Sequence, residues 1–334
     1  MPTQIKLKSK RILITGAGGF IGSHLVERLV GEGCKVRAMV HYNSSGIWGN
    51  LELLTDEVKQ AIEVFPGDIT DPFSVLKAVE GCDWVFHLAA LIAIPYSYTA
   101  PQSYVATNVA GTLNVMEASR RCGVEKVVHT STSETYGTAI YTPIDEKHPL
   151  QGQSPYSASK IGADKIAESY YCSFNLPVAT IRPFNTYGPR QSARAVIPTI
   201  ISQVLAGKRK INLGSISPIR DFSYVKDTVD GFVKIAVSNR SMGEVINVGF
   251  GEGITIGKLA EMIIKIIGKE VEIVSDDLRI RPENSEVMEL ICANDKARKL
   301  IGWKPRHTLS EGIKETLGYI EKNLHRYKAD IYNV

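Results

Sequence analysis

The sequence predicts an α/β fold with a doubly wound parallel sheet and a smaller, mixed α/β second lobe. Three observations predict this class. Short apolar segments alternate with amphipathic helical segments over residues 11–182. A glycine-rich turn joins the first strand to the first helix, and the alternation of strands and helices changes after Pro183. Alternation of this kind favours parallel strands joined by crossover helices.

The first strand and helix carry a phosphate-binding pattern. The strand Arg11–Thr15 (R-I-L-I-T) is followed directly by G-A-G-G-F-I-G and by apolar residues at helical spacing. The first glycine permits the tight turn, the second lets a pyrophosphate approach the backbone, and the third lets helix and strand pack closely. The helix N-terminus offers free N–H groups to the phosphates. We therefore predict a dinucleotide-binding (Rossmann) site with a wall formed by Gly16, Gly19, Phe20, Ile21 and Gly22.

The second and third strands bear on the identity of the cofactor. The strand Lys35–Val40 runs into H-Y-N, without the carboxylate that usually reads the ribose of NAD and without a nearby arginine for the 2′-phosphate of NADP. We expect NAD and do not exclude NADP. After the strand Ile62–Phe65, Asp68 is a candidate acceptor for the adenine amino group, with Ile69 beside it. Alternatively, Asp68 caps the helix that begins near Pro72.

The fourth strand, Trp84–Leu88, ends in small residues. Leu88, Ala89 and Ala90 would let a cofactor lie against the backbone. His87 stands in an apolar run, and we interpret it as a core histidine. A single helix is expected over Pro101–Cys122.

The candidate catalytic residues follow the fifth strand, 126–130, at the edge of the sheet where open α/β folds bind ligands. The stretch S-T-S-E-T-Y-G over 131–137 brings hydroxyls and a carboxylate to that edge. The next helix, 154–174, begins with an N-cap serine and a first-turn proline. Tyr156 and Lys160 are four residues apart, so they share one face of it. A phenol beside an ammonium group suits the removal of a proton from an alcohol.

The second half of the chain is interleaved. A sixth strand, 176–182, precedes the polar loop F-N-T-Y-G-P-R-Q. Beyond it we expect helices over 197–205 and 225–237 and strands over 211–213, 245–248 and 271–274, with 245–248 in the main sheet. The predicted dinucleotide-binding domain covers 1–182 plus about 220–250. The predicted second lobe covers about 183–219 and 251–334.

Composition argues against several classes of function. The 334 residues are 44% hydrophobic and 22% charged, which is typical of a soluble globular protein. A net charge of +4 without a dense basic run argues against a nucleic-acid partner. The five scattered cysteines favour reduced thiols and give no support to a metal site. Without an apolar signal or spanning segment, we expect no membrane partner and a cytoplasmic location.

Six motifs in this order resemble the extended short-chain dehydrogenase/reductase family over nearly the whole chain: T-G-A-G-G-F-I-G, D-I-T-D, L-A-A, Y-S-A-S-K, R-P-F-N-T-Y-G-P-R and R-D-F-S-Y-V-K-D. The resemblance implies that Tyr156 is the general base or acid. It implies that Lys160 holds the cofactor ribose and lowers the tyrosine pKa. It also implies that Thr132 binds the substrate oxygen that is oxidised.

Glu134 distinguishes members of that family. Its 4-epimerases generally lack an acid at this position, whereas its sugar-nucleotide 4,6-dehydratases have one. The resemblance implies that the cofactor oxidises C4, Glu134 takes the C5 proton, water leaves from C5 and C6, and the hydride returns to C6. Ser133 replaces an aspartate of the dTDP-glucose enzymes, as in the T-S-E of GDP-mannose 4,6-dehydratases. We therefore expect Glu134 to serve as both base and acid, assisted by Ser133 or Thr132.

Several alternatives remain open. T-S-E-x-Y-G with N-T-Y-G-P-R also resembles UDP-glucuronate decarboxylases, and a sugar-nucleotide epimerase is a second alternative. A non-catalytic dinucleotide-binding regulator is a third, which the intact tyrosine and lysine disfavour. The finer pattern, including R-Q-S-A-R-A-V-I-P-T, is most similar to 4,6-dehydratases of bacterial legionaminic-acid biosynthesis. That resemblance implies GDP-N-acetylglucosamine as the substrate.

The resemblance also implies how the nucleotide sugar binds in the second lobe. Asn185, Arg220 and Arg281 match residues that contact the diphosphate, and Arg190 and Arg194 are weaker candidates for the same entrance. The family pairs the helices 101–122 and 154–174 with those of a partner, so a homodimer is expected.

Overall fold

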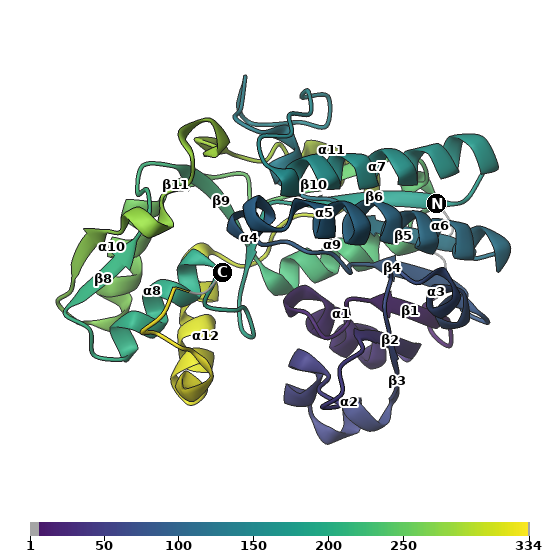
Figure 1. The fold of residues 1–334 in the computed structure, drawn as a ribbon, viewed down its shortest axis with the longest axis horizontal. Coiled ribbons are helices and arrows are strands. Elements are labelled where there is room, and N and C mark those ends of the chain that lie inside the picture. The colour runs from purple at the N-terminus through teal and green to yellow at the C-terminus, as the bar shows by residue number, and fades with distance from the viewer. Residues whose placement is uncertain (1–6, 333–334) are drawn as a thin grey trace.

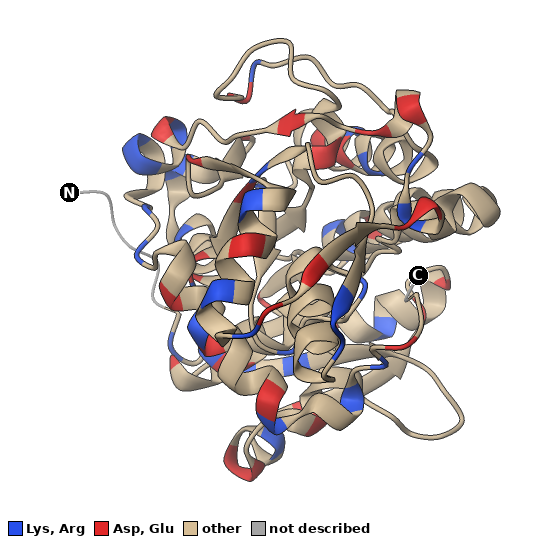
Figure 2. Cartoon of the chain, turned by 90° about the vertical axis from the view of Figure 1, so that its left-hand side faces the viewer, with Lys and Arg blue, Asp and Glu red and all other residues tan. Residues whose placement is uncertain are grey.

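The computed structural model describes residues 7–332 and places a large parallel sheet beside a smaller, mixed part (Figure 1). Most of the N-terminal stretch in which no signal segment is expected lies outside the described residues, as do the last two residues of the predicted second lobe. Basic and acidic residues are interspersed over the side of the molecule that Figure 2 faces.

The main sheet has seven parallel strands in the order β10-β6-β5-β4-β1-β2-β3, which confirms the predicted fold class. Its strands are β1 (Arg11–Thr15), β2 (Lys35–His41), β3 (Ile62–Gly67), β4 (Trp84–His87), β5 (Lys126–Thr130), β6 (Val178–Pro183) and β10 (Val245–Val248). Alternate residues of β1 enter different cores: Ile12 and Ile14 pack with α1 and α9, and Leu13 packs with α3 and α6. Both faces of the sheet are therefore covered, as the continuous apolar strands require.

Most helices match the predicted pattern, but α4 was not predicted and the predicted helix over 101–122 is interrupted. They are α1 (Phe20–Gly31), α2 (Asp56–Gln60), α3 (Pro72–Val79), α4 (Ile94–Thr99), α5 (Pro101–Tyr104), α6 (Gly111–Arg121), α7 (Pro155–Phe174), α8 (Val196–Leu205), α9 (Val225–Val237), α10 (Ile256–Ile267), α11 (Asp295–Ile301) and α12 (Leu309–Lys322). Short 3₁₀ turns lie at η1 (Gly49–Leu53), η3 (Ser133–Tyr136), η4 (Asn239–Ser241), η5 (Asp277–Arg279), η6 (Glu283–Ser285) and η7 (Leu324–Arg326).

The predicted helix over 101–122 is not uniformly α-helical. A π-helical segment, η2 (Val105–Ala110), separates α5 from α6. Within it, the amide of Asn108 is hydrogen-bonded to both backbone groups of Leu91, at 2.8 and 2.9 Å, and to the hydroxyl of Ser159 at 2.9 Å. π-Segments are rare and frequently occur at functional sites. Here the Asn108 side chain fixes the loop after β4, which carries Ala89 and Ala90.

The smaller part contains two further sheets. One consists of β7 (Asn185–Tyr187), β9 (Ile219–Tyr224), β11 (Gly253–Thr255) and β13 (Glu289–Leu290), and the other of β8 (Lys210–Leu213) and β12 (Glu272–Ser275). Between these segments the chain returns through α9 and β10 to the main sheet, as predicted for 245–248. Strands β7, β9, β11 and β13 were not predicted from the sequence.

The described residues contain neither a helix long and apolar enough to cross a membrane nor a group of three or more side chains arranged to hold a metal ion. His87 is a core histidine, as interpreted. It is 2% exposed and bonded to the hydroxyls of Thr15 and Thr112 at 2.8 and 3.0 Å.

Candidate active site

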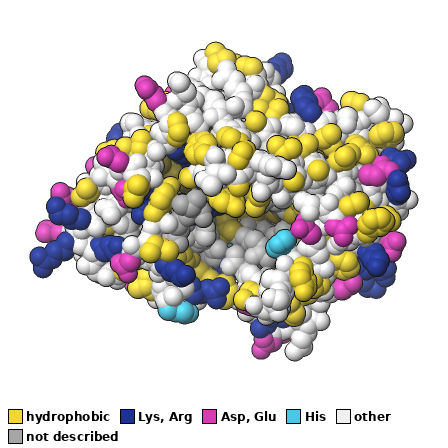
Figure 3. Space-filling view, viewed as in Figure 1, with side chains coloured by type: hydrophobic (Ala, Val, Ile, Leu, Met, Phe, Trp, Pro, Cys, Tyr) yellow, Lys and Arg dark blue, Asp and Glu magenta, His cyan; other side chains and the backbone are white. Residues whose placement is uncertain are grey.

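A cavity of about 850 Å³ lies between the carboxyl ends of the main sheet and the smaller part. The face shown in Figure 3 is hollowed near its centre, with apolar side chains around the rim. The predicted site residues line this cavity except Asp68, Ile69 and the weaker candidate Arg190. The topology thus brings together residues that are spread over most of the sequence.

The glycine turn forms a cradle that side chains would fill. Gly16 has φ +69°, and a Cβ there would lie 2.7 Å from the backbone nitrogen of Ala89. A Cβ on Gly22 would collide with the carbonyl oxygen of Gly16. Gly19 is the N-cap of α1, where no side chain caps the first turn and no acidic residue occupies it. The turn therefore presents N–H groups and a positive helix end, which fit a pyrophosphate.

Asp68 and Ile69 lie at the edge of this region. The carboxylate of Asp68 accepts hydrogen bonds from the backbone and hydroxyl of Thr70, each at 2.8 Å, and lies 4.0 Å from the His41 ring. The alternative role of Asp68 as a helix cap is wrong, because Asp71 caps α3. The side chain of Ile69 is buried and packs against α6. Contacts of either residue with an adenine ring stay a prediction.

Tyr156 and Lys160 are fixed by the start of α7. Ser154 and Ser157 form a reciprocal capping box there, so the first turn is firmly placed. Tyr156 is 7% exposed and Lys160 is 5% exposed. The ammonium of Lys160 donates to the carbonyl oxygen of Thr130 at 2.6 Å. The pair therefore faces the carboxyl end of β5, inside the cavity.

Tyr156 is less acidic in this structure than an ordinary tyrosine side chain. Burial raises its pKa to about 12, while a hydrogen bond with Thr132 and the charge of Arg194 act in the opposite direction. Burial has the largest effect on this pKa, so the net shift is upward, and the lowering by Lys160 that the resemblance implies stays a prediction. Burial also lowers the pKa of Lys160 to about 8. Arg194 is the cation that favours the phenolate of Tyr156.

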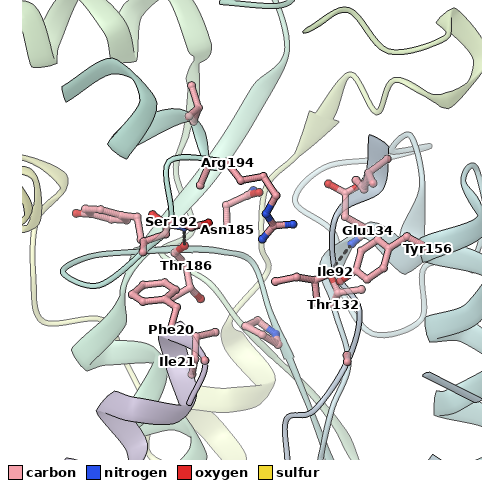
Figure 4. Close-up of a pocket in the computed structure, with 18 of the residues that line it drawn as sticks. Phe20, Ile21, Ile92, Thr132, Glu134, Tyr156, Asn185, Thr186, Ser192 and Arg194 are labelled. Atoms are coloured by element: carbon pink, nitrogen blue, oxygen red, sulfur yellow. Dashed lines mark hydrogen bonds between the residues drawn. The ribbon is translucent and has the colours of Figure 1, made fainter. Parts of the chain in front are cut away.

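The hydroxyl and carboxylate cluster is shaped by a tight turn after β5. Thr132 caps η3, and its hydroxyl accepts the backbone N–H of Glu134 at 3.3 Å. Figure 4 shows Thr132, Glu134 and Tyr156 on one side of the cavity. The charge of Glu134 raises the pKa of both Tyr156 and Arg220, so this carboxylate is within electrostatic reach of both side chains. Ser133 also lines the cavity and is 3% exposed.

A buried ion network supports this edge from behind. The carboxylate of Asp164, one turn beyond Lys160, accepts hydrogen bonds from Ser131 at 2.5 Å and from Arg182 at 2.8 Å, and His129 is 2.9 Å away. Arg182 also donates to the Ser131 hydroxyl at 3.0 Å. The charge of Asp164 raises the pKa of Lys160, against the larger effect of burial. The network thus ties α7 to β5 and β6.

The predicted phosphate-binding residues converge on the other side of the cavity. Arg220 is 6% exposed and pairs with Glu286 at 3.1 Å, and Arg281 is 3.6 Å from the same carboxylate. A guanidinium nitrogen of Arg281 is buried without a hydrogen-bond partner in the described chain. The amide of Asn185 donates to the carbonyl oxygen of Asp221 at 3.3 Å. One carboxylate thus positions two cations whose remaining N–H groups suit phosphate oxygens.

Two residues that line the cavity, Arg279 and Tyr332, were not predicted as site residues from the sequence. Arg279 stacks on the ring of Tyr332 at 4.6 Å and is held by Asp276 at 2.8 Å, and both stacked residues line the cavity. No local pattern marks Tyr332, because only the path of the C-terminal segment brings it here. Arg190 does not line the cavity. It is bonded to Glu27 and His24 on α1, whereas the neighbouring Arg194 does line it.

The doubly wound sheet, the glycine cradle and the paired Tyr156 and Lys160 define the chain as an extended short-chain dehydrogenase/reductase. A profile of the family described as GDP-mannose 4,6 dehydratase matches residues 13–316. The chain therefore belongs to this family of nucleotide-sugar 4,6-dehydratases and related epimerases.

Individual relatives agree with that assignment. The chain is 33% identical to a mouse (Mus musculus) dTDP-D-glucose 4,6-dehydratase over 328 residues, covering 96% of this chain and 91% of that protein. It is 35% identical to a UDP-glucose 4-epimerase of Mycolicibacterium smegmatis, covering 92% and 98%. The structure of the dTDP-glucose 4,6-dehydratase DesIV from Streptomyces venezuelae, with NAD and TYD bound, is similar with a TM-score of 0.86 at 26% identity, covering 95% and 99%.

Proposed function

We propose that this chain is a nucleotide-sugar 4,6-dehydratase that converts its substrate to a 4-keto-6-deoxy sugar. The observation that carries the proposal is the position of Glu134, beside Tyr156 and Thr132 and within electrostatic reach of Arg220. Oxidation and reduction at C4 alone need no carboxylate at this point. A reaction that also moves the C5 proton does.

The cofactor that we propose is NAD, which the DesIV structure contains. Gly16, Gly19 and Gly22 would hold its pyrophosphate, Ala89 would form the wall beside it, and Lys160 would hold its ribose. When bound, NAD supplies the redox chemistry, accepting a hydride from C4 of the sugar and returning it to C6.

The protein side chains would move the protons. Tyr156 takes the proton of the C4 hydroxyl while the Thr132 hydroxyl holds that oxygen. The C4 ketone acidifies the C5 proton, and Glu134 takes it. Glu134 then returns that proton to the C6 hydroxyl, with Ser133 orienting it, so that one water leaves and a C5–C6 double bond forms. Tyr156, Thr132, Ser133, Glu134 and Lys160 are the proposed catalytic residues.

The substrate is proposed to be a nucleoside-diphosphate sugar, with GDP-N-acetylglucosamine favoured by the finer sequence pattern. Arg220, Arg281 and Asn185 would bind the diphosphate, since guanidinium groups suit phosphate oxygens. Arg279 and Tyr332 would flank the base. This substrate would place the enzyme in legionaminic-acid biosynthesis.

A second candidate is a 4-epimerase, favoured by the identity to the M. smegmatis enzyme. An epimerase would use Tyr156 and Lys160 in the same way and leave Glu134 without a proton to move. The presence of a carboxylate at this position makes the dehydratase the stronger proposal.

A homodimer is also proposed, through α5, α6 and α7. Apolar side chains are exposed on α6 and α7, with Leu113 at 40% and Phe174 at 52%, and on the π-segment η2 between α5 and α6, with Val105 at 55%. Sedimentation of the purified protein should give twice the monomer mass, and a monomer at micromolar concentration would contradict the proposal.

The reaction is tested by incubating the protein and NAD with GDP- or UDP-N-acetylglucosamine in heavy water, followed by mass spectrometry. The expected product has lost one water and carries one solvent deuterium at C5, because the hydride returns to C6 and C5 then takes a proton that comes from solvent. An unchanged sugar mass with inversion at C4 would support the epimerase. Release of CO₂ from UDP-glucuronate in a parallel incubation would instead identify a decarboxylase.

A further inference from the structure

Arg194 is a cation inside the cavity whose charge is not neutralised by an acid. It lies in the loop between β7 and α8 and lines the cavity. Figure 4 shows its guanidinium group reaching toward Tyr156, Thr132 and Glu134 from the opposite wall. Within residues 7–332, Arg194 makes neither a hydrogen bond nor an ion pair. A partly buried guanidinium group in this state is suited to a ligand oxygen that enters the cavity.

The surroundings of Arg194 differ from those of the predicted phosphate arginines. Arg220 and Arg281 share Glu286 as a partner. Arg194 instead acts electrostatically on the phenols of Tyr156 and Tyr104. The guanidinium group of Arg194, beside the proposed catalytic tyrosine, is therefore separate from the pair of arginines around Glu286.

The two arginines of this loop have different surroundings, because among the described residues Arg190 is paired and Arg194 is not. Arg190, four residues earlier, is bonded to His24 and Glu27 and fastens the loop to α1. With the loop fastened at that point, Arg194 projects from a fixed position just before α8. A positioned donor of this kind is effective where charge develops during a reaction.

We propose that Arg194 binds the C4 oxygen of the sugar and stabilises the negative charge that develops there when Glu134 removes the C5 proton. This inference rests on the proposed dehydratase function. Tyr156 and Thr132 would hold that same oxygen, so the guanidinium group that faces them faces the oxygen too. Removal of the C5 proton from the 4-ketone moves the C5–H electron pair into an enolate whose charge lies on the C4 oxygen. The pair then forms the C5–C6 double bond as the C6 hydroxyl leaves as water with the proton from Glu134.

The competing assignment is a third phosphate arginine, and binding of a nucleoside diphosphate without a sugar separates the two. Calorimetry with GDP and with UDP is measured on the wild type, on Arg194→Gln and on Arg220→Gln as the matched control. We expect Arg194→Gln to bind the preferred diphosphate within about twofold of the wild type and Arg220→Gln to lose about tenfold or more. An equal loss in both variants would overturn the assignment to the C4 oxygen.

The rates of deuterium entry at C5 and of water loss provide a second test. In heavy water, Arg194→Gln should slow deuterium entry at C5 and loss of water by about 10²–10³-fold, the usual effect of losing one charge-stabilising donor. Arg194→Lys should recover part of that loss. Wild-type rates in Arg194→Gln would overturn the inference alone. A wild-type enzyme that releases no water from any of the nucleotide sugars would overturn the proposed function as well.

Discussion

Replacing Asp164 with asparagine should remove a buried charge that holds the active-site edge of the sheet together. Asp164 is 6% exposed, and its partner Arg182 is 3% exposed. The variant keeps an acceptor for Ser131 but leaves the guanidinium group of Arg182 without a counter-charge. Breaking a buried pair from one side costs about 3–5 kcal/mol. Because asparagine retains part of the hydrogen bonding, we expect a loss of about 3 kcal/mol in the free energy of unfolding.

The assay is equilibrium unfolding in urea at neutral pH, with Glu168→Gln as the matched control. Glu168 lies one turn further along α7 in an exposed pair with Lys165, so its loss should have no measurable effect. Burial alone would raise the pKa of Asp164, but the hydrogen bond with His129 and the charge of Arg182 hold it below its usual value. The stabilisation is therefore fully present above about pH 4 and declines as the pH falls toward the lowered pKa. Equal stability of Asp164→Asn and the wild type at neutral pH would refute this reasoning.

Three further predictions concern residues that line the cavity. Gly22→Ala should abolish NAD binding measured by calorimetry, because its Cβ would collide with the glycine turn, whereas Gly31→Ala at the open end of the same helix should bind normally. The rate of cofactor reduction should keep rising with pH through pH 8, because Tyr156 must lose its proton to act as the base and burial raises its pKa to about 12; a rate that falls over this range would contradict the assignment. Tyr332→Ala should raise KM for the nucleotide sugar and leave kcat within about twofold, while Tyr332→Phe should behave as wild type because the stacking ring remains; a change confined to kcat would exclude a base-binding role.

The larger part of the fold could be predicted because its signals are local. The strands β1 and β5 match their predicted bounds, and an apolar strand followed at once by a glycine turn specifies both elements. The start of α7 follows from the serine and proline that cap it. Strand β10 was also predicted in the main sheet, since V-I-N-V is rich in β-branched apolar residues and has the right length.

The smaller sheet could not be predicted in the same way. Strands β7, β11 and β13 are two or three residues long, and their partner β9 lies far from each in the chain. Segments this short carry no periodicity that separates a strand from a loop. The π-segment in the predicted helix over 101–122 was hidden for another reason, because it depends on the contact of Asn108 with Leu91.

The residues of the cavity also divide into those that local sequence motifs mark and those that only tertiary structure brings there. Residues in sequence motifs, such as Tyr156 and Lys160, were placed correctly inside it. Glu286 and Tyr332 belong to no such motif, and only tertiary structure brings them to the arginines they contact. The pKa of Tyr156 also escaped prediction, since the extent of its burial cannot be read from the spacing of two residues on a helix.

The most direct test of the dehydratase assignment is a single-turnover experiment on Glu134→Gln with NAD and the nucleotide sugar that the wild type consumes. Absorbance of the reduced nicotinamide and the mass of the sugar are followed together. We predict that the reduced cofactor accumulates, because Tyr156 and Lys160 are intact, while the sugar loses no water and takes up no deuterium at C5. Dehydration of the sugar by this variant at the wild-type rate would contradict the central role given to Glu134.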